Sequence, residues 1–213
     1  RDAALALVKL MLEKPAYDEA ALTREKARAI AALQDADTRP ATIAAKRFSA
    51  LIYPNHPYGA RPDPASVGAI TRADLVAFHR EHYVADRAVV SIIGDVSRAE
   101  AEAIAQRLTE NLPRANAAAV ELPPVMLPQA TTVKLPHPAA QSHIYLGMPG
   151  ISRTDPDYFP LLVGNYTLGG GGFVSRLMKE VREKRGYAYS VSSYFMPRKL
   201  AGPFQIGLQT KRE

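Results

Sequence analysis

The sequence of 213 residues contains no cysteine, which excludes disulfides, thiol catalysis and cysteine-ligated metal sites. It has no apolar run long enough to span a membrane, and no signal peptide is visible. It also lacks a long basic run, although its formal net charge is +6. Because acidic and basic residues are interspersed as on solvated helix faces, we expect no nucleic-acid partner.

The composition that remains is that of an ordinary globular protein. Hydrophobic residues make up 47% of the chain and charged residues 23%, which is enough to bury a core. The first letters, RDAALALVKLMLEK, resemble the interior of a helix rather than a natural start. We therefore expect a fragment of a longer protein, in which the missing targeting signal carries no weight.

The first half of the sequence is predicted to be mainly helical. Apolar periodicity and capping residues place helices at 3–14, 18–34, 40–53, 71–83 and 97–111. Pro40 occupies a first-turn position, where proline is favourable. Thr71 with Asp74, and Ser97 with Glu100, have the spacing of capping boxes. These helices therefore have defined starting points.

Strands are predicted later in the chain and once within the helical half. The β-branched and alternating segments lie at 88–93, 131–135, 142–148, 187–195 and 203–210. A proline-rich stretch at 113–128 predicts an interdomain linker between segments 1–112 and 129–213. Neighbouring hairpin-like strands favour antiparallel pairing, so the predicted fold class is α+β rather than a doubly wound parallel sheet.

The glycine run in LGGGGFVSRLMKEVREKRGYAYS raises the question of a phosphate-binding loop. A Walker loop requires G-x-x-x-x-G-K-[ST] after a strand, whereas Gly169–Gly172 follow a helix-like segment and no lysine stands at the required place. Glycine can end one helix by adopting positive φ and let the next begin close by. We therefore predict a turn between helices.

The helix after this turn places an apolar stripe at i, i+3, i+4 and i+7, which we predict to be core: Val174, Leu177, Met178 and Val181. Arg182 lies about 90° from the centre of the stripe. At this edge a long side chain can bury its stem and present its guanidinium to a cleft. Ser175 is interpreted as a helix-start serine, because no G-x-S-x-G motif surrounds it.

The histidines do not form a convincing metal site. His79 and His82 are three positions apart, whereas H-E-x-x-H and H-x-x-E-H place two histidines at i and i+4. They are interpreted as surface histidines of an amphipathic helix. His56, His137 and His143 have no acidic neighbours suited to a ligand set. The pairs of aspartates at 35 and 37, and at 155 and 157, read as turn and cap residues.

Taken together, the motifs HPYG, FHREHYVADRAVVSIIGDV, QSHIYLGMPG and LGGGGFVSRLMKEVREKRGYAYSV resemble the pitrilysin/insulinase-type zinc peptidases, the inverzincins, especially their bacterial and mitochondrial-processing branch. The resemblance covers nearly the whole chain. It implies two similar α+β domains, each an antiparallel sheet covered by helices, that enclose a peptide-binding chamber. Residues 1–112 match the later part of the first domain, and residues 129–213 the early part of the second.

The resemblance also implies that this chain is noncatalytic. The H-x-x-E-H motif would lie upstream of Arg1, and no copy occurs in the sequence. In active members a third zinc ligand, a glutamate, follows another glutamate by seven residues and precedes a proline by eight. With Glu25 and Pro40 in those places, the ligand position falls on Ala32, whose methyl group cannot bind zinc. We therefore expect no zinc site in this chain.

The same resemblance implies a role in substrate binding. In the family's second domain an arginine and a tyrosine seven residues apart contact the peptide near the scissile bond, and Arg182 and Tyr189 match them. A guanidinium and a phenol can donate hydrogen bonds to a peptide carbonyl or to the oxyanion formed during hydrolysis. The competing interpretation is an arginine at a helix edge and a packed strand tyrosine.

Three readings follow from this resemblance. In the first, the chain is an inactive subunit or domain that binds a peptide or unfolded polypeptide and pairs, as a homo- or heterodimer, with a zinc-bearing homologue. In the second it is a structural scaffold like a core protein. In the third it is a fragment of an active zinc protease whose H-x-x-E-H lies upstream. The compartment stays open, with a bacterial periplasm favoured by the resemblance.

Overall fold

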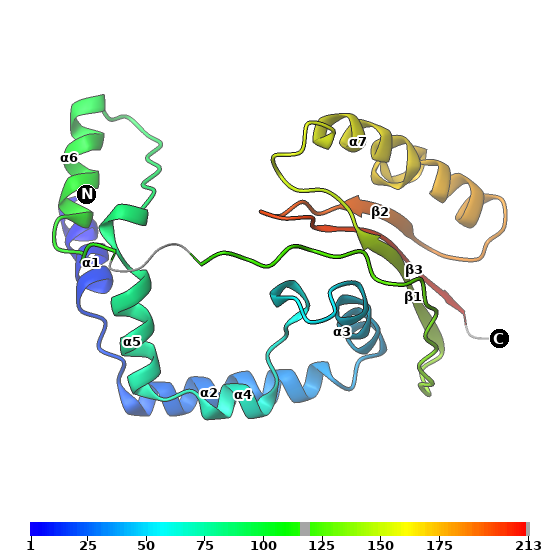
Figure 1. Ribbon diagram of the computed structural model, residues 1–213, viewed down its shortest axis with the longest axis horizontal. Helices are drawn as coiled ribbons and strands as arrows, with labels where there is room; N and C mark the ends of the chain where they lie inside the picture. The colour runs from blue at the N-terminus through cyan, green and yellow to red at the C-terminus, as the bar shows by residue number, and fades with distance from the viewer. Residues whose placement is uncertain (116–119, 212–213) are drawn as a thin grey trace. The chain divides into compact units, whose positions relative to one another are not determined.

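The computed structural model describes residues 1–115 and 120–211 and divides into two compact units (Figure 1). Unit 1 consists of Arg1–Ala31 and Asp63–Val120, and unit 2 of Ala32–Pro62 and Glu121–Glu213. Residues 32–62 thus group with unit 2 rather than with the rest of the first half of the chain. The domain boundary that we expect at 113–128 stays a prediction.

Unit 1 is built from helices in its described residues. They are α1 (Asp2–Glu13), most of α2 (Glu19–Ala36), α4 (Pro64–Ala69), α5 (Arg72–His82), a 3₁₀ turn (Ala85–Arg87) and α6 (Arg98–Thr109). Helices α1 and α6 lie side by side (Figure 1), joined by ion pairs at Arg1–Glu100, Asp2–Arg107 and Lys9–Glu110. The predicted helices of this half are confirmed, with boundaries shifted by a few residues.

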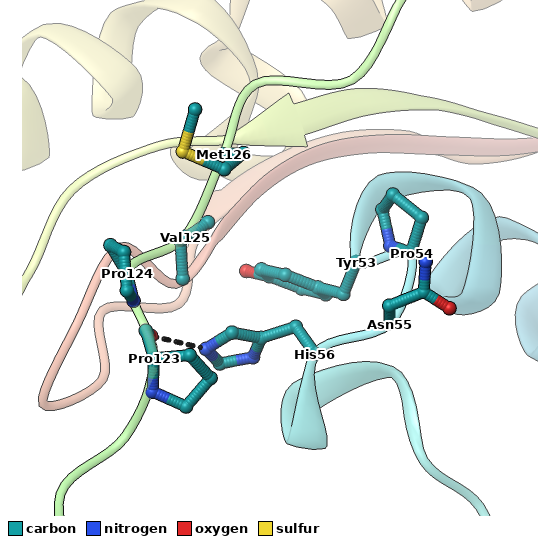
Figure 2. Close-up of a pocket in the computed structure, with 8 residues that line it drawn as sticks. All are labelled: Tyr53, Pro54, Asn55, His56, Pro123, Pro124, Val125 and Met126. Carbon is teal, nitrogen blue, oxygen red and sulfur yellow. Dashed lines mark hydrogen bonds between the residues drawn. The ribbon is translucent and has the colours of Figure 1, made fainter.

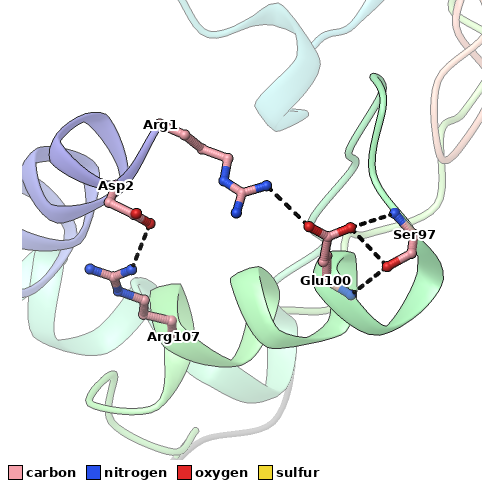
Figure 3. A network of polar contacts seen from close by, with 5 residues as sticks. All are labelled: Arg1, Asp2, Ser97, Glu100 and Arg107. Carbon is pink, nitrogen blue, oxygen red and sulfur yellow. Dashed lines mark hydrogen bonds and ion pairs between the residues drawn. The ribbon is translucent and has the colours of Figure 1, made fainter.

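Both predicted capping boxes are present. At the start of α6, the Ser97 hydroxyl accepts a hydrogen bond from the Glu100 backbone N–H at 3.3 Å. The Glu100 carboxylate accepts one from the Ser97 backbone N–H at 2.9 Å (Figure 3). Thr71 and Asp74 make the equivalent pair at the start of α5. The caps satisfy amide groups that a helix N-terminus leaves unpaired.

The α6 cap gives a pH-dependent prediction. Hydrogen bonds from the Ser97 backbone and hydroxyl, and then from Arg1, hold the pKa of Glu100 below the ordinary 4.5. A depressed folded-state pKa means that this stabilisation is present above the ordinary pKa and is lost as pH falls through the folded value. We expect Ser97→Ala to move the pKa of Glu100 back toward 4.5 and to destabilise the helix by about 1 kcal/mol.

Carboxyl-carbon NMR titration of wild-type protein and Ser97→Ala measures this pKa directly, and Ser66→Ala, which removes the N3 serine of the separate α4 capping box, serves as the control. An unchanged Glu100 pKa in Ser97→Ala would show that the Ser97 hydroxyl does not contribute to the shift, because the backbone N–H of residue 97 remains in this variant.

The strand predicted at 88–93 is wrong for this structure. No strand is assigned there, and Val89 and Ile93 are 91% and 101% exposed. A strand requires a neighbouring strand to pair its backbone, and all three strands of the described residues lie in unit 2. The β-branched side chains thus have strand propensity without a partner. The strand predicted at 131–135 is also wrong, since no strand is assigned to these residues although they belong to unit 2.

Unit 2 contains a three-stranded sheet, which confirms the predicted α+β class with antiparallel pairing. Its strands are β1 (Gln141–Pro149), β2 (Val191–Phe195) and β3 (Pro203–Lys211), in the order β1-β3-β2. β1 pairs with β3 from Gln141↔Lys211 to Pro149↔Pro203, and β2 pairs with β3 from Val191↔Leu208 to Phe195↔Phe204. The predicted strand at 187–195 therefore begins four residues later than expected.

Helical segments cover both faces of this sheet (Figure 1). They are α3 (Pro40–Ile52), a 3₁₀ turn (Pro57–Gly59), α7 (Tyr158–Asn165), a π-helical turn (Tyr166–Gly170), a second 3₁₀ turn (Gly172–Val174) and a π-helical segment (Met178–Glu183). On one face, Phe48 of α3 contacts Tyr145 of β1, with ring centroids 5.9 Å apart. Elsewhere in the unit, Met178 and Val191 are buried.

The glycine run forms the predicted turn between helical segments. Gly172 adopts φ +59°, which side-chain-bearing residues rarely tolerate. Gly169 packs so closely against β2 that an added Cβ would lie 2.4 Å from the Ser193 hydroxyl. The turn therefore needs glycine at two places for two different reasons, and neither involves a phosphate.

The core stripe predicted for the next helix is partly wrong. Met178 is buried and Leu177 and Val181 are half-buried, but Val174 is 77% exposed. Val174 lies in the 3₁₀ turn, and Ser175 then follows in an extended conformation, so Val174 does not share the helix periodicity. Ser175 is fully buried, and its hydroxyl accepts a hydrogen bond from the Met178 N–H at 3.4 Å, in keeping with a helix-start serine.

Candidate substrate-contact site

Arg182 and Tyr189, the two candidate contact residues, lie next to each other in unit 2. The Cζ atom of Arg182 lies 5.1 Å from the ring centroid of Tyr189. A second ring, that of Phe173, lies 4.8 Å from the same atom. Cation–π contacts of this kind favour a guanidinium over the ring face. Two rings therefore hold one cation at the end of the π-helical segment.

The guanidinium of Arg182 has no carboxylate within ion-pair distance among the described residues. Its neighbour Glu180 instead pairs with Lys184 at 2.6 Å and with Arg185 at 3.0 Å. Hydrogen bonds from Lys184 and then Arg185 lower the pKa of Glu180, so that carboxylate stays ionised and committed to them. The N–H groups of Arg182 are left available for an acceptor outside this cluster.

Tyr189 is presented by the segment that leads into β2. Gly186 turns the chain with φ +63°, and Ala188 is buried at 6% exposure. The tyrosines on either side of this anchor are exposed, Tyr187 at 63% and Tyr189 at 78%. The Tyr189 phenol is therefore not the packed strand tyrosine of the competing interpretation, because it lies before β2 and in solvent.

The residues that the structure describes do not fit a zinc ion. Ala32 is exposed on α2, and Glu25, about two turns earlier on the same helix, pairs with Arg24 and Arg28. Within residues 1–115 and 120–211, no group of three or more His, Cys, Asp or Glu side chains is placed to hold a metal. We accordingly assign no step of any reaction to a metal on this chain.

The histidines have structural partners. His79 is partly buried, with its Nε2 2.7 Å from the Leu12 carbonyl and its ring stacked on Tyr83. His82 contacts the ring of Phe78 on the same helix, at 4.4 Å between centroids. His137 accepts a hydrogen bond from the Ala139 N–H at 3.1 Å. The prediction of two surface histidines is therefore only partly right, because His79 of α5 is partly buried and contacts the Leu12 carbonyl of α1.

His56 borders a pocket of about 220 Å³ that the sequence did not indicate (Figure 2). Its Nδ1 accepts a hydrogen bond from the Tyr58 N–H at 3.0 Å, so its Nε2 carries the proton donated to the Pro123 carbonyl at 3.0 Å. Tyr53 forms another wall, and burial raises its pKa to about 12. Both histidine nitrogens are satisfied by the protein, so the ring serves to hold residues 123–126 against this turn.

Asn165 and Ser193 form a buried polar pair that sequence reasoning missed. The Asn165 amide donates to the Ser193 carbonyl at 2.9 Å, and the Ser193 hydroxyl donates to the Asn165 side-chain oxygen. Asn165 is 6% exposed and Ser193 fully buried. The pair joins the end of α7 to β2, next to Gly169, and so fixes the helical layer that carries Arg182.

The sequence of this chain matches a known protein family. The family profile described as Peptidase M16 inactive domain matches residues 69–213. The chain belongs to the peptidase M16 family. The resemblance to pitrilysin/insulinase-type zinc peptidases is thereby confirmed, and a match to the inactive domain agrees with the noncatalytic prediction.

Individual relatives of the family agree with this assignment. The solved peptidase M16 inactive domain from Pseudomonas fluorescens is 39% identical with a TM-score of 0.95, covering 99% of this chain and 52% of that one. An uncharacterized zinc protease of Mycobacterium leprae is 34% identical over 84% of this chain and 40% of its own length. The mitochondrial-processing peptidase subunit beta of Blastocladiella emersonii is 25% identical over 86% of this chain and 41% of its own length. The chain thus spans about half or less of these relatives.

Among the described helices, none combines the length and the apolar character needed to cross a bilayer.

Proposed function

We propose that this M16 chain is a noncatalytic domain that helps to form a peptide-binding chamber, in which Arg182 and Tyr189 contact the substrate while a partner bearing zinc carries out hydrolysis. The observation that carries the proposal is the contact between the half-buried Arg182 and the exposed Tyr189, at 5.1 Å from Cζ to ring centroid. Their spacing matches the arginine and tyrosine that the family resemblance implies.

The chemistry of the pair supports peptide binding. The Arg182 guanidinium offers charged N–H donors and has no carboxylate partner among the described side chains. Tyr189 is exposed, and its hydroxyl can also donate a hydrogen bond. A peptide carbonyl accepts both, and an oxyanion formed on that carbonyl accepts them more strongly, because a charged acceptor strengthens each hydrogen bond.

The partner and its zinc are also part of the proposal. Since the described residues hold no fitting ligand set, the proposal assigns water activation to another chain or another domain. The mitochondrial-processing peptidase relative is by its name a subunit, which makes pairing between homologous chains plausible for this one. A homo- or heterodimer with a zinc-bearing homologue would bring the two halves of such a site together.

The test of this function is the loss of the Tyr189 hydroxyl. In a complex reconstituted with a zinc-bearing homologue, we expect Tyr189→Phe to lower kcat for cleavage of a labelled peptide about tenfold with little change in KM, because a donor to the oxyanion acts mainly in the transition state. The matched control is Tyr187→Phe, a similarly exposed tyrosine of the same segment.

Three other outcomes would redirect the proposal. Wild-type kinetics in Tyr189→Phe would remove the role assigned to the phenol. A full-length protein that cleaves peptide alone, with zinc bound, would identify the chain as a fragment of an active protease. A complex without any saturable peptide binding would instead favour the scaffold function.

A further inference from the structure

Phe173 is an exposed aromatic residue whose position has no packing explanation. It lies in the 3₁₀ turn Gly172–Val174 and is 68% exposed, so burial of its ring contributes little to the core. The Cζ atom of Arg182 lies over its ring at 4.8 Å from the centroid, closer than to Tyr189. The ring thus contacts the cation and leaves its remaining surface in solvent.

The backbone around Phe173 fixes where the ring stands. Gly172 supplies the positive φ that starts the turn, and the Ser175 N–H donates to the Gly172 carbonyl at 3.1 Å. Ser175 itself is fully buried, which anchors the far end of the turn. The backbone of Phe173 is therefore held between two constrained positions. The Arg182 guanidinium, by contrast, lies at the end of a long, flexible side chain.

We infer that Phe173 is a positioning residue, which together with Tyr189 clamps the Arg182 guanidinium with its N–H edges facing outward for a peptide carbonyl. This inference rests on the proposed function, since it assigns Phe173 a purpose at the same site. A free arginine side chain has large rotamer entropy that binding must remove. Contact with two rings removes part of it before the peptide arrives, so the site is preorganised.

The clamp predicts a specific pattern of coupling. We expect Phe173→Leu, which keeps apolar bulk and removes the ring face, to weaken binding of fluorescein-labelled casein peptides about threefold. In an Arg182→Ala background the same substitution changes binding by less than about 1.5-fold, because Phe173 acts only through Arg182. Phe173→Tyr, which keeps the ring, restores the affinity. Phe159→Leu is the control, since Phe159 is 70% exposed and lies on α7.

An NMR measurement on the peptide-free protein separates this inference from the proposed function. Ring currents of Phe173 shift the Arg182 side-chain signals upfield, and Phe173→Leu is expected to return them toward random-coil positions while Phe159→Leu does not. If Arg182→Ala leaves peptide affinity unchanged but the shifts behave as expected, the clamp stands and the proposed function fails.

Two results would overturn the clamp itself. The first is an Arg182 spectrum that Phe173→Leu does not alter. The second is an equal loss of affinity from Phe173→Leu with and without Arg182, which would make Phe173 a direct peptide contact or a structural residue.

Discussion

Arg182→Ala is expected to reduce kcat/KM for peptide cleavage by the reconstituted complex by about 100-fold, the largest functional effect that we predict for this chain. The reason is that the Arg182 guanidinium has no carboxylate partner among the described residues. It therefore breaks no ion pair within the protein when it binds a developing oxyanion. Steady-state cleavage of a labelled peptide measures the loss. Arg182→Lys keeps the charge but not the planar fork of donors, so we expect it to recover only part of the activity.

The matched control is Arg176→Ala, an exposed arginine at the start of the same helical segment. Its removal changes the net charge equally and is expected to leave kcat/KM within about twofold, because long-range effects of a single exposed charge are screened. If Arg176→Ala and Arg182→Ala have the same effect, the activity depends on general positive charge rather than on the Arg182 site.

Gly169→Ala is expected to destabilise unit 2 by about 3 kcal/mol, the largest effect on stability that we predict. The new Cβ would meet the Ser193 hydroxyl at 2.4 Å, the Ser193 backbone nitrogen at 2.6 Å and the Leu177 side chain at 2.7 Å. A strand backbone cannot move aside without disturbing the buried Asn165–Ser193 pair. Urea unfolding followed by near-UV circular dichroism, which reports the tyrosines, measures the loss.

Gly164→Ala serves as the internal comparison for this substitution. It lies five residues earlier, inside α7, where an added Cβ would meet nothing within 4 Å. We expect it to be neutral or to stabilise the helix by about 0.5–1 kcal/mol, because alanine is the better helix former. Equal stability of the two variants would mean that the close approach to β2 does not require glycine at position 169.

The parts of the fold that sequence reasoning obtained correctly depend on contacts close in the chain. The capping boxes of Thr71 and Ser97 join residues three positions apart, and Pro40 acts through its own φ angle. Such features can be predicted from the sequence because the interacting residues lie within one helical turn of each other. Antiparallel pairing was predicted because neighbouring strand patterns follow each other closely between residues 187 and 210.

The wrong strand at 88–93 and the overlooked Asn165–Ser193 pair both concern partners that lie far apart in the chain, whereas the error at Val174 is local. The AVVSII segment has strand propensity, but pairing needs a second strand, and the described part of unit 1 provides none. Asn165 and Ser193 are 28 residues apart and each resembles an ordinary surface residue in the sequence. Val174 was assigned to a helix face because the periodicity does not show that the chain turns at Ser175.

The candidate site was only half predictable from the sequence. The resemblance to the family indicated Arg182 and Tyr189 as a pair, because their seven-residue spacing alone favours a helix-edge arginine and a packed tyrosine. Phe173 was missed, because its contact with Arg182 depends on the path of the glycine turn, which brings two residues nine positions apart together. The pocket beside His56 was missed because its walls come from segments 53–56 and 123–126.

The central claim is that Arg182 and Tyr189 bind an unfolded polypeptide, and fluorescence anisotropy of fluorescein-labelled casein peptides titrated with the protein tests it most directly. Saturable binding by wild-type protein that falls by at least about tenfold in an Arg182→Ala/Tyr189→Phe double variant, with Arg176→Ala unchanged, is the result that the account predicts. Equal affinity of the wild-type protein and the double variant would contradict it.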